Sequence, residues 1–142
     1  MRVSVTGSNS GVGKATASIL AAAGHHVVLA CRTLSKAEQA AAEMAGDAEV
    51  CHLDLADLSS VRKFADSVES VDVLVNNAGV LCPRLTRTAD GFEAHVGTNY
   101  LGHFALRCLL GDRIRDRARE PVLRRRLREL SAELTDCDWG SV

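Results

Sequence analysis

Aromatic side chains are scarce in this chain of 142 residues, which contains three Phe, one Tyr and one Trp although 46% of its residues are hydrophobic. A folded core must therefore be built mainly from aliphatic side chains. No stretch approaches the ~18 consecutive apolar residues of a membrane span, so we expect no membrane-spanning segment. The 17 basic and 18 acidic residues leave a net charge of −1, which gives no overall attraction to nucleic acid or to an anionic membrane.

Metal-ligand patterns are also missing. The five cysteines form no CxxC pair, and the five histidines show no spacing such as HExxH. We expect reduced thiols and no metal site. Met1 and Arg2 lead directly into a strand-like run and not into an apolar signal segment, so we expect a cytoplasmic protein.

Strand-like and helix-like segments alternate through the first 110 residues. Apolar, β-branched runs predict four strands, at 3–6, 26–31, 49–53 and 71–75. Helical patterns predict helices over 12–23, from 35 to about 45, from about 58 to 68, and over 91–110. This alternation predicts an α/β fold, with a parallel sheet, helices on both of its faces and right-handed crossovers.

Three details of the helices can be predicted as well. The spacing of apolar residues in the first helix turns Val12, Ala15 and Ile19 toward the core. Ser35 and Glu38 form a capping-box pattern at the start of the second helix. Either Asp57 or Ser59 caps the third helix.

The composition changes near Gly111. Residues 113–128 contain eight arginines and two acids, whereas residues 129–138 contain four acids and no base. We therefore divide the chain into an α/β half-domain, residues 1–110, and an atypical Arg-rich tail, residues 111–142, which is irregular or helical. A solvated or out-of-frame tail is favoured over a nucleic-acid-binding one, because aromatic residues do not interleave with the arginines.

A glycine-rich segment, TGSNSGVG at 6–13, follows the first predicted strand and opens the first helix. Free backbone N–H groups and the positive helix end can bind a diphosphate there, although a tight strand-to-helix turn would also need glycines. The spacing is GxxxGxG and not GxxxxGK[ST], so nucleoside triphosphate hydrolysis is not expected. We expect cofactor contacts from the whole loop, that is from Gly7, Ser8, Asn9, Ser10, Gly11, Val12 and Gly13.

Three motifs in this order resemble the short-chain dehydrogenase/reductase family: the glycine loop, Asn76-Asn77-Ala78-Gly79, and Asn99-x-x-Gly102. The stretches at 30–32, 53–65 and 89–106 look like its retinol-dehydrogenase-like branch. The resemblance covers roughly residues 2–110. It implies an incomplete Rossmann-like, doubly wound parallel sheet of about four strands in the order 3-2-1-4, with residues 1–110 as a dinucleotide-binding half-domain. It implies an oxidoreductase that interconverts alcohols and carbonyls on retinol-, steroid- or lipid-like substrates with a nicotinamide cofactor.

The second predicted strand ends in Cys31-Arg32, and no acid follows until Glu38. An acid at this strand end usually binds the ribose 2′-OH of NAD, whereas an arginine can bind a 2′-phosphate. The resemblance points the same way, so NADP(H) is favoured over NAD(H), although Arg32 could also be an ordinary solvated residue.

Two further segments match the family's cofactor contacts. The resemblance assigns Asp54 and Leu55 to the adenine ring, although Asp54 could instead form a turn. It places Asn77, Ala78 and Gly79 near the nicotinamide ribose. Asn side chains at a strand end can also satisfy backbone groups, so a structural role is equally open there.

The family's catalytic set is present only in part. The resemblance implies a YxxxK pair, a Ser, and an Asn that holds a proton-relay water. Asn99 matches the family's Asn. The alternative is an Asn inside a helix whose side chain is only satisfied by a bend of that helix. Tyr100 is the only tyrosine, Phe104 stands four residues after it, and no lysine follows Lys63. We therefore expect a chain that is non-catalytic alone. The alternative is an NADP(H)-binding or interaction module that pairs with another copy or with a full-length homologue through the exposed edge of the fourth strand.

Overall fold

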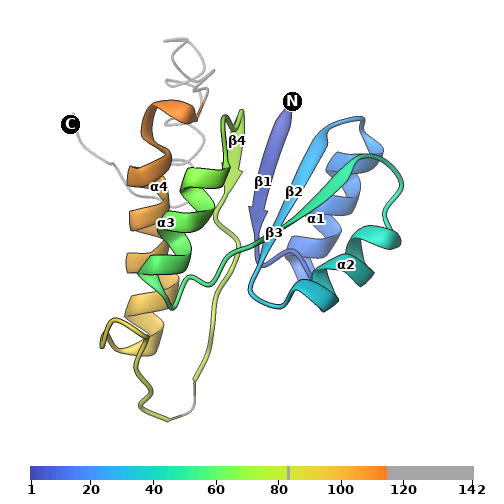
Figure 1. Cartoon of the computed structure of the whole chain (residues 1–142). Helices are drawn as coiled ribbons and strands as arrows, with labels where there is room; N and C mark the ends of the chain where they lie inside the picture. Colours follow the sequence, from blue (N-terminus) through green and yellow to red (C-terminus); the bar gives the residue numbers. More distant parts are fainter. Residues whose placement is uncertain (83, 115–142) are drawn as a thin grey trace, which may run out of the picture.

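One parallel sheet organises the computed structural model, which describes residues 1–82 and 84–114 (Figure 1). The strand order is β3-β2-β1-β4, as predicted. The strands are β1 (Arg2–Thr6), β2 (His26–Cys31), β3 (Ala48–His52) and β4 (Val73–Val75). Val5 pairs with Leu29 of β2 on one side and with Val75 of β4 on the other, so β1 is central. The predicted tail lies almost entirely outside the described residues.

Helices cover both faces of the sheet, so the fold is doubly wound (Figure 1). One face packs against α1 and α2, and the other against α3 and α4, each around its own hydrophobic cluster. The helices are α1 (Gly11–Ala22), α2 (Leu34–Ala42), α3 (Leu58–Ser67), the π-helical turn η1 (Val96–Gly102), α4 (His103–Leu110) and the short 3-10 turn η2 (Gly111–Arg113). Within the described residues, no helix is long and apolar enough to cross a membrane.

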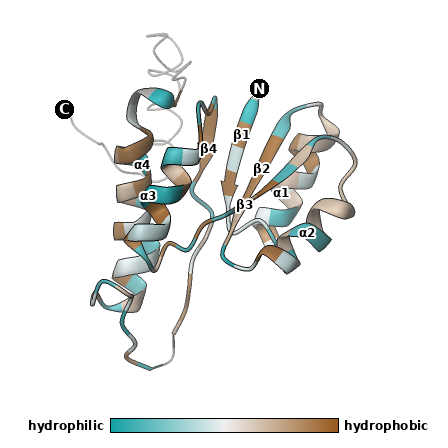
Figure 2. Ribbon diagram, in the orientation of Figure 1, coloured by the Kyte–Doolittle hydropathy of each residue, from teal (hydrophilic) through white to brown (hydrophobic). Residues whose placement is uncertain are grey.

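Strand β2 shows why the sheet is buried on both sides. Val27, Val28 and Leu29 are all fully buried, and Val28 packs in one cluster whereas its two neighbours pack in the other. Figure 2 shows the hydrophobic residues of the strands between the two helical layers. A continuous apolar run is what a strand covered on both faces requires.

The predicted inner face of α1 was wrong. Gly13, Ala17 and Ala21 are buried, whereas Val12 and Ile19 are 76% and 70% exposed. The reason is close packing: a Cβ atom at Gly13 would lie 2.3 Å from Asn77 Nδ2 and 2.6 Å from the Gly7 carbonyl oxygen. Only the smallest side chains fit between α1 and the sheet, so the larger apolar residues turn outward.

The capping-box prediction was also wrong. Helix α2 begins after Thr33, which makes no side-chain capping bond, and Ser35 lies inside the first turn. The helix ends at Ala42, earlier than the sequence predicted. For α3, Asp57 and not Ser59 is the cap: its carboxylate accepts backbone N–H bonds from Ser59 at 2.8 Å and from Ser60 at 3.4 Å.

The fourth helical stretch begins at Ala94, later than predicted, because residues before it form a turn closed by an antiparallel bridge between Arg87 and Glu93. After Ala94 and His95 it passes into η1 at Val96 and continues as α4. After α4 the chain returns to the sheet, where Val71 donates its N–H to the Arg113 carbonyl at 2.9 Å and forms a parallel bridge with Ile114.

Candidate dinucleotide-binding site

The start of α1 has free hydrogen-bonding capacity. Ser10 precedes the helix but makes no side-chain capping bond, and the first turn contains no acid. The backbone N–H groups of the first turn and the positive end of the helix dipole are therefore available to an anion. Gly11 has φ +55°, and no atom lies within 4 Å of the place where its Cβ would be, so the backbone is open to a ligand there.

The loop before α1 is braced from within. Gly7 adopts φ +64°, and a Cβ there would lie 2.9 Å from Ala78 Cα. The Gly7 N–H donates to the Ala30 carbonyl at 2.9 Å, and the buried Ser8 hydroxyl donates to the Val5 carbonyl at 2.8 Å. The Ser8 side chain thus braces the loop from within, and its predicted contact with a cofactor stays a prediction.

The segment after β4 joins the carboxyl ends of β1 and β4. Asn77 Nδ2 donates to the carbonyls of Thr6 at 2.9 Å and Gly7 at 3.3 Å. The N–H groups of Asn77 and Ala78 donate to Thr6 Oγ1 at 3.0 and 2.9 Å. The predicted structural role of the Asn side chain is therefore realised at Asn77.

One cleft of about 130 Å³ lies at the carboxyl ends of the strands. Seven residues singled out from the sequence line it: Gly7, Asn9, Arg32, Asp54, Leu55, Ala78 and Gly79. Four lining residues were missed: Ala30, Leu53, Val80 and Thr98. Ala30 and Leu53 lie at the ends of apolar runs, two residues before Arg32 and one before Asp54, so their positions in the sequence could have identified them, whereas no local signal marks Val80 and Thr98.

Arg32 and Asp54 approach the cleft from neighbouring strand ends. Arg32 is exposed and makes no ion pair with any described residue. Asp54 Oδ1 accepts the Ala56 N–H at 2.9 Å, which is the turn predicted as its alternative role, and this turn keeps the carboxylate at the cleft. Among the residues that the structure describes, the rim of the cleft therefore carries a guanidinium without an ion-pair partner and a carboxylate.

Asn99 lies outside this cleft, on η1. Its Oδ1 accepts the Val80 N–H at 2.8 Å, and its Nδ2 donates to the Val80 carbonyl at 3.0 Å. Asn99 also lines a separate groove of about 360 Å³, together with Asn76, Ala78, Tyr100, His103, Phe104 and Arg107. Its amide thus holds the backbone that follows the NNAG motif.

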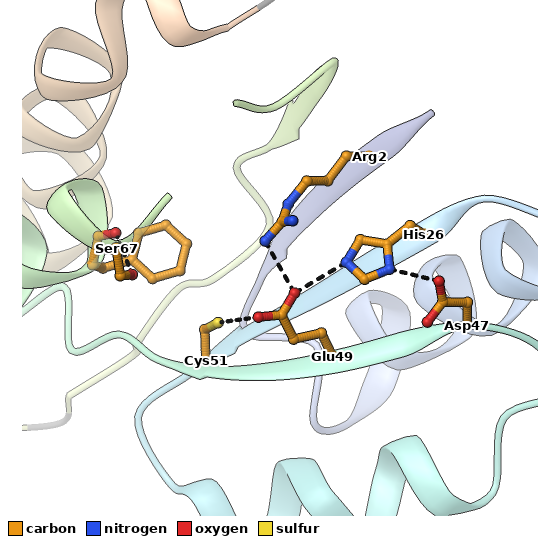
Figure 3. A network of polar contacts seen from close by, with 7 residues as sticks. Arg2, His26, Asp47, Glu49, Cys51 and Ser67 are labelled. Carbon is orange, nitrogen blue, oxygen red and sulfur yellow. Dashed lines mark hydrogen bonds and ion pairs between the residues drawn. The ribbon is translucent and has the colours of Figure 1, made fainter. Parts of the chain in front are cut away.

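A charged cluster lies at the opposite, amino ends of the strands (Figure 3). Glu49 pairs with Arg2 and with His26, both at 3.0 Å, and His26 contacts Asp47 at 2.7 Å. Burial and the neighbouring Glu49 raise the pKa of the Cys51 thiol to about 11, so this thiol is protonated at neutral pH. The cluster ties β1, β2 and β3 together and is not part of the cleft.

Known proteins resemble this chain in sequence and in fold. A family model described as short chain dehydrogenase matches residues 1–117. Retinol dehydrogenase 13 of Homo sapiens is 46% identical over 131 residues, which cover 85% of this chain and 39% of that protein. The chain therefore spans about two fifths of the length of the curated relatives it matches.

Two solved structures are similar as well. An uncharacterised protein from Mycobacterium paratuberculosis superposes with a TM-score of 0.77 at 54% identity, covering 80% of this chain and 42% of that one. A metagenomic short-chain oxidoreductase in complex with NADP superposes with a TM-score of 0.68 at 30% identity, covering 77% of this chain and 54% of that one.

Proposed function

The chain belongs to the short-chain dehydrogenase family, and on that premise we propose that its cleft binds a nicotinamide dinucleotide, with NADP(H) preferred over NAD(H). The observation that carries the proposal is the convergence of Gly7, Arg32 and Asp54 on one cleft beside the uncapped start of α1. The cleft stands at the carboxyl ends of parallel strands, where doubly wound sheets bind their ligands.

The diphosphate would be held by the start of α1. Gly11 leaves the backbone open, and Gly13 lets the helix lie close to the sheet, so N–H groups face a ligand without side chains in between. Ser10, Val12 and Asn9 would contact the cofactor from the same loop. Hydride transfer is the chemistry that the nicotinamide supplies when it is bound.

Arg32 supports the choice of NADP(H). The Arg32 guanidinium at the end of β2, which makes no ion pair with any described residue, can form charge-assisted bonds to a 2′-phosphate, whereas an NAD-binding site usually has an acid there. Asp54 and Leu55 would contact the adenine ring, and Ala78 and Gly79 would let the cofactor approach the end of β4.

Titration of the purified 142-residue chain with NADPH and with NADH, followed by cofactor fluorescence, tests this proposal. Arg32→Glu should weaken NADPH binding about 10- to 100-fold, because a hydrogen bond to a charged group contributes about 1.5–3 kcal/mol. NADH binding should change much less. Arg62→Glu changes the same charge at an exposed site on α3, away from the cleft, and should leave both affinities unaltered. Equal NADPH affinities for wild type and Arg32→Glu would refute the role of Arg32.

For the whole protein, we propose oxidation and reduction of alcohol and carbonyl groups on retinol-, steroid- or lipid-like substrates. Within these 142 residues, Asn99 is the one match to the family's catalytic set, so we propose that this chain binds cofactor without turning it over. Reduction of NADP+ by the purified chain in the presence of a retinoid alcohol would overturn that statement without affecting the binding proposal.

A second candidate function is pairing through the edge of β4. This strand bonds to β1 on one side, and on its other side the described residues provide only the bridge from Val71 to Ile114. Val73 is 40% exposed there. An unpaired strand edge can take a strand from another chain. Sedimentation at several concentrations tests this, and a monomer throughout would exclude pairing with a second copy.

A further inference from the structure

His103 is a buried polar residue that no motif explains. It is 7% exposed and stands at the first position of α4, where η1 ends. Its Nε2 lies 3.0 Å from Thr6 Oγ1 at the end of β1, and its Nδ1 lies 3.0 Å from the Asn99 carbonyl oxygen. The imidazole therefore connects two segments that are almost a hundred residues apart in sequence.

The hydrogen-bonding partners determine the tautomer of His103. A carbonyl oxygen can only accept, so Nδ1 carries the hydrogen that is donated to Asn99. Thr6 Oγ1 already accepts N–H bonds from Asn77 and Ala78, which use both of its lone pairs. The Thr6 hydroxyl therefore donates to Nε2, at 3.0 Å, in preference to the Val75 carbonyl at 3.4 Å.

This bond pattern stabilises the π-helical turn. The backbone N–H of His103 donates to Tyr100, three residues back. The Asn99 carbonyl, four residues back, accepts the imidazole N–H of His103. The side chain thus adds a hydrogen bond across the junction of η1 and α4.

The same turn forms part of the cofactor cleft. Thr98 of η1 lines the cleft, and Asn99 holds both backbone polar groups of Val80, which also lines it. Gly102 packs against Leu55: a Cβ at Gly102 would lie 2.4 Å from the Leu55 carbonyl oxygen. A change in the helical register of η1 would therefore move residues on two sides of the cleft.

We propose that His103 is a positioning residue: it holds η1 in its π-helical register against Thr6 and, through Asn99 and Val80, sets the wall of the cofactor cleft. The identity of the ligand rests on the function proposed above, whereas the hydrogen-bond arrangement does not. His103 does not line the cofactor cleft and acts on it only through its neighbours.

Nitrogen-15 NMR of the unmodified 142-residue chain tests the arrangement directly. The expected result is a neutral His103 ring protonated at Nδ1. An imidazolium, or a ring protonated at Nε2, overturns the proposal, and this measurement requires no cofactor and no variant.

Variants then test the consequence. His103→Leu should speed exchange of the Val80 amide hydrogen about tenfold, the effect of losing one or two neutral hydrogen bonds, and should weaken binding of 2′,5′-ADP by a similar factor. Exchange of the Leu29 amide hydrogen in the sheet reports global stability. If His103 only stabilised the whole fold, His103→Leu would speed exchange of the Leu29 and Val80 amides equally and leave the affinity of the folded chain for 2′,5′-ADP unchanged. That equal acceleration would refute the proposal.

His103→Asn is the conservative variant, because its Nδ2 can replace Nδ1 as the donor to Asn99. It should restore most of the protection of the Val80 amide against exchange. This variant keeps the test decisive if His103→Leu does not fold. His25→Leu is the matched control, since the half-buried side chain of His25 makes no hydrogen bond or ion pair with any described residue. If wild type does not bind 2′,5′-ADP, the proposed function fails, while the tautomer and the Val80 exchange still decide the role of His103.

Discussion

Gly13→Ala gives the sharpest test of the packing at the glycine loop. The new Cβ would lie 2.3 Å from Asn77 Nδ2 and 2.6 Å from the Gly7 carbonyl oxygen, so the amide must move. Asn77 would then lose its bonds to Thr6 and Gly7, which contribute about 0.5–1.5 kcal/mol each. The better helix propensity of Ala offsets up to about 1 kcal/mol. The expected net loss in the free energy of unfolding is about 1–2 kcal/mol.

Urea unfolding followed by circular dichroism measures this loss as a lower transition midpoint with an unchanged slope. Gly79→Ala is the matched control for stability, because its Cβ would meet only Asn99 Oδ1 at 3.7 Å, an ordinary contact. We expect that variant to differ from wild type by about 0.5 kcal/mol or less. If Gly13→Ala is as stable as Gly79→Ala, the close approach of α1 to Asn77 is not what selects glycine at position 13.

Two pH dependences follow from the charged contacts. The hydrogen bond to Asp47 raises the pKa of His26. The stabilisation by His26 should therefore be fully present below pH 6.5 and lost as the pH rises through the higher folded-state pKa. The difference in the free energy of unfolding between wild type and His26→Gln, measured across this range, checks this expectation, and a difference that grows with pH would contradict it. N–H bonds from His95 and Val96 lower the pKa of Glu93 from 4.5 to about 2, so its contribution should be present above pH 4.5 and lost as the pH falls toward 2. Glu93→Gln should therefore be less stable than wild type at neutral pH and similar to it near pH 2.

Much of the fold could be predicted because the pattern is local. Each apolar run bounded by a glycine or a polar turn became a strand, and short connections between strands and helices allow only a parallel, doubly wound arrangement. Seven predicted site residues share one cleft because they all follow strand ends, and the carboxyl ends of parallel strands meet at the same edge. Whether they bind NADP(H) stays a prediction.

Side-chain direction was less predictable. Helical periodicity allows either Val12 and Ile19 or Gly13 and Ala17 to form the buried face of α1. Hydrophobicity favours Val12 and Ile19, whereas Gly13 and Ala17 are the buried pair. The distance between helix and sheet decides between them, and that distance depends on Asn77, more than sixty residues away. Apolar periodicity alone carries no information about this spacing.

The sequence by itself determined the alternation of strands and helices and the position of the glycine loop, because these depend on neighbouring residues and on short connections. Its motifs also identified the family, and the resemblance supplied the strand order. Only the tertiary structure decided which face of α1 is buried, that Val80 and Thr98 complete the cleft, and that His103 joins Thr6 to Asn99. These features depend on hydrogen bonds and on contacts at Gly13 between segments that meet only after the sheet has formed, and no local pattern records such distances.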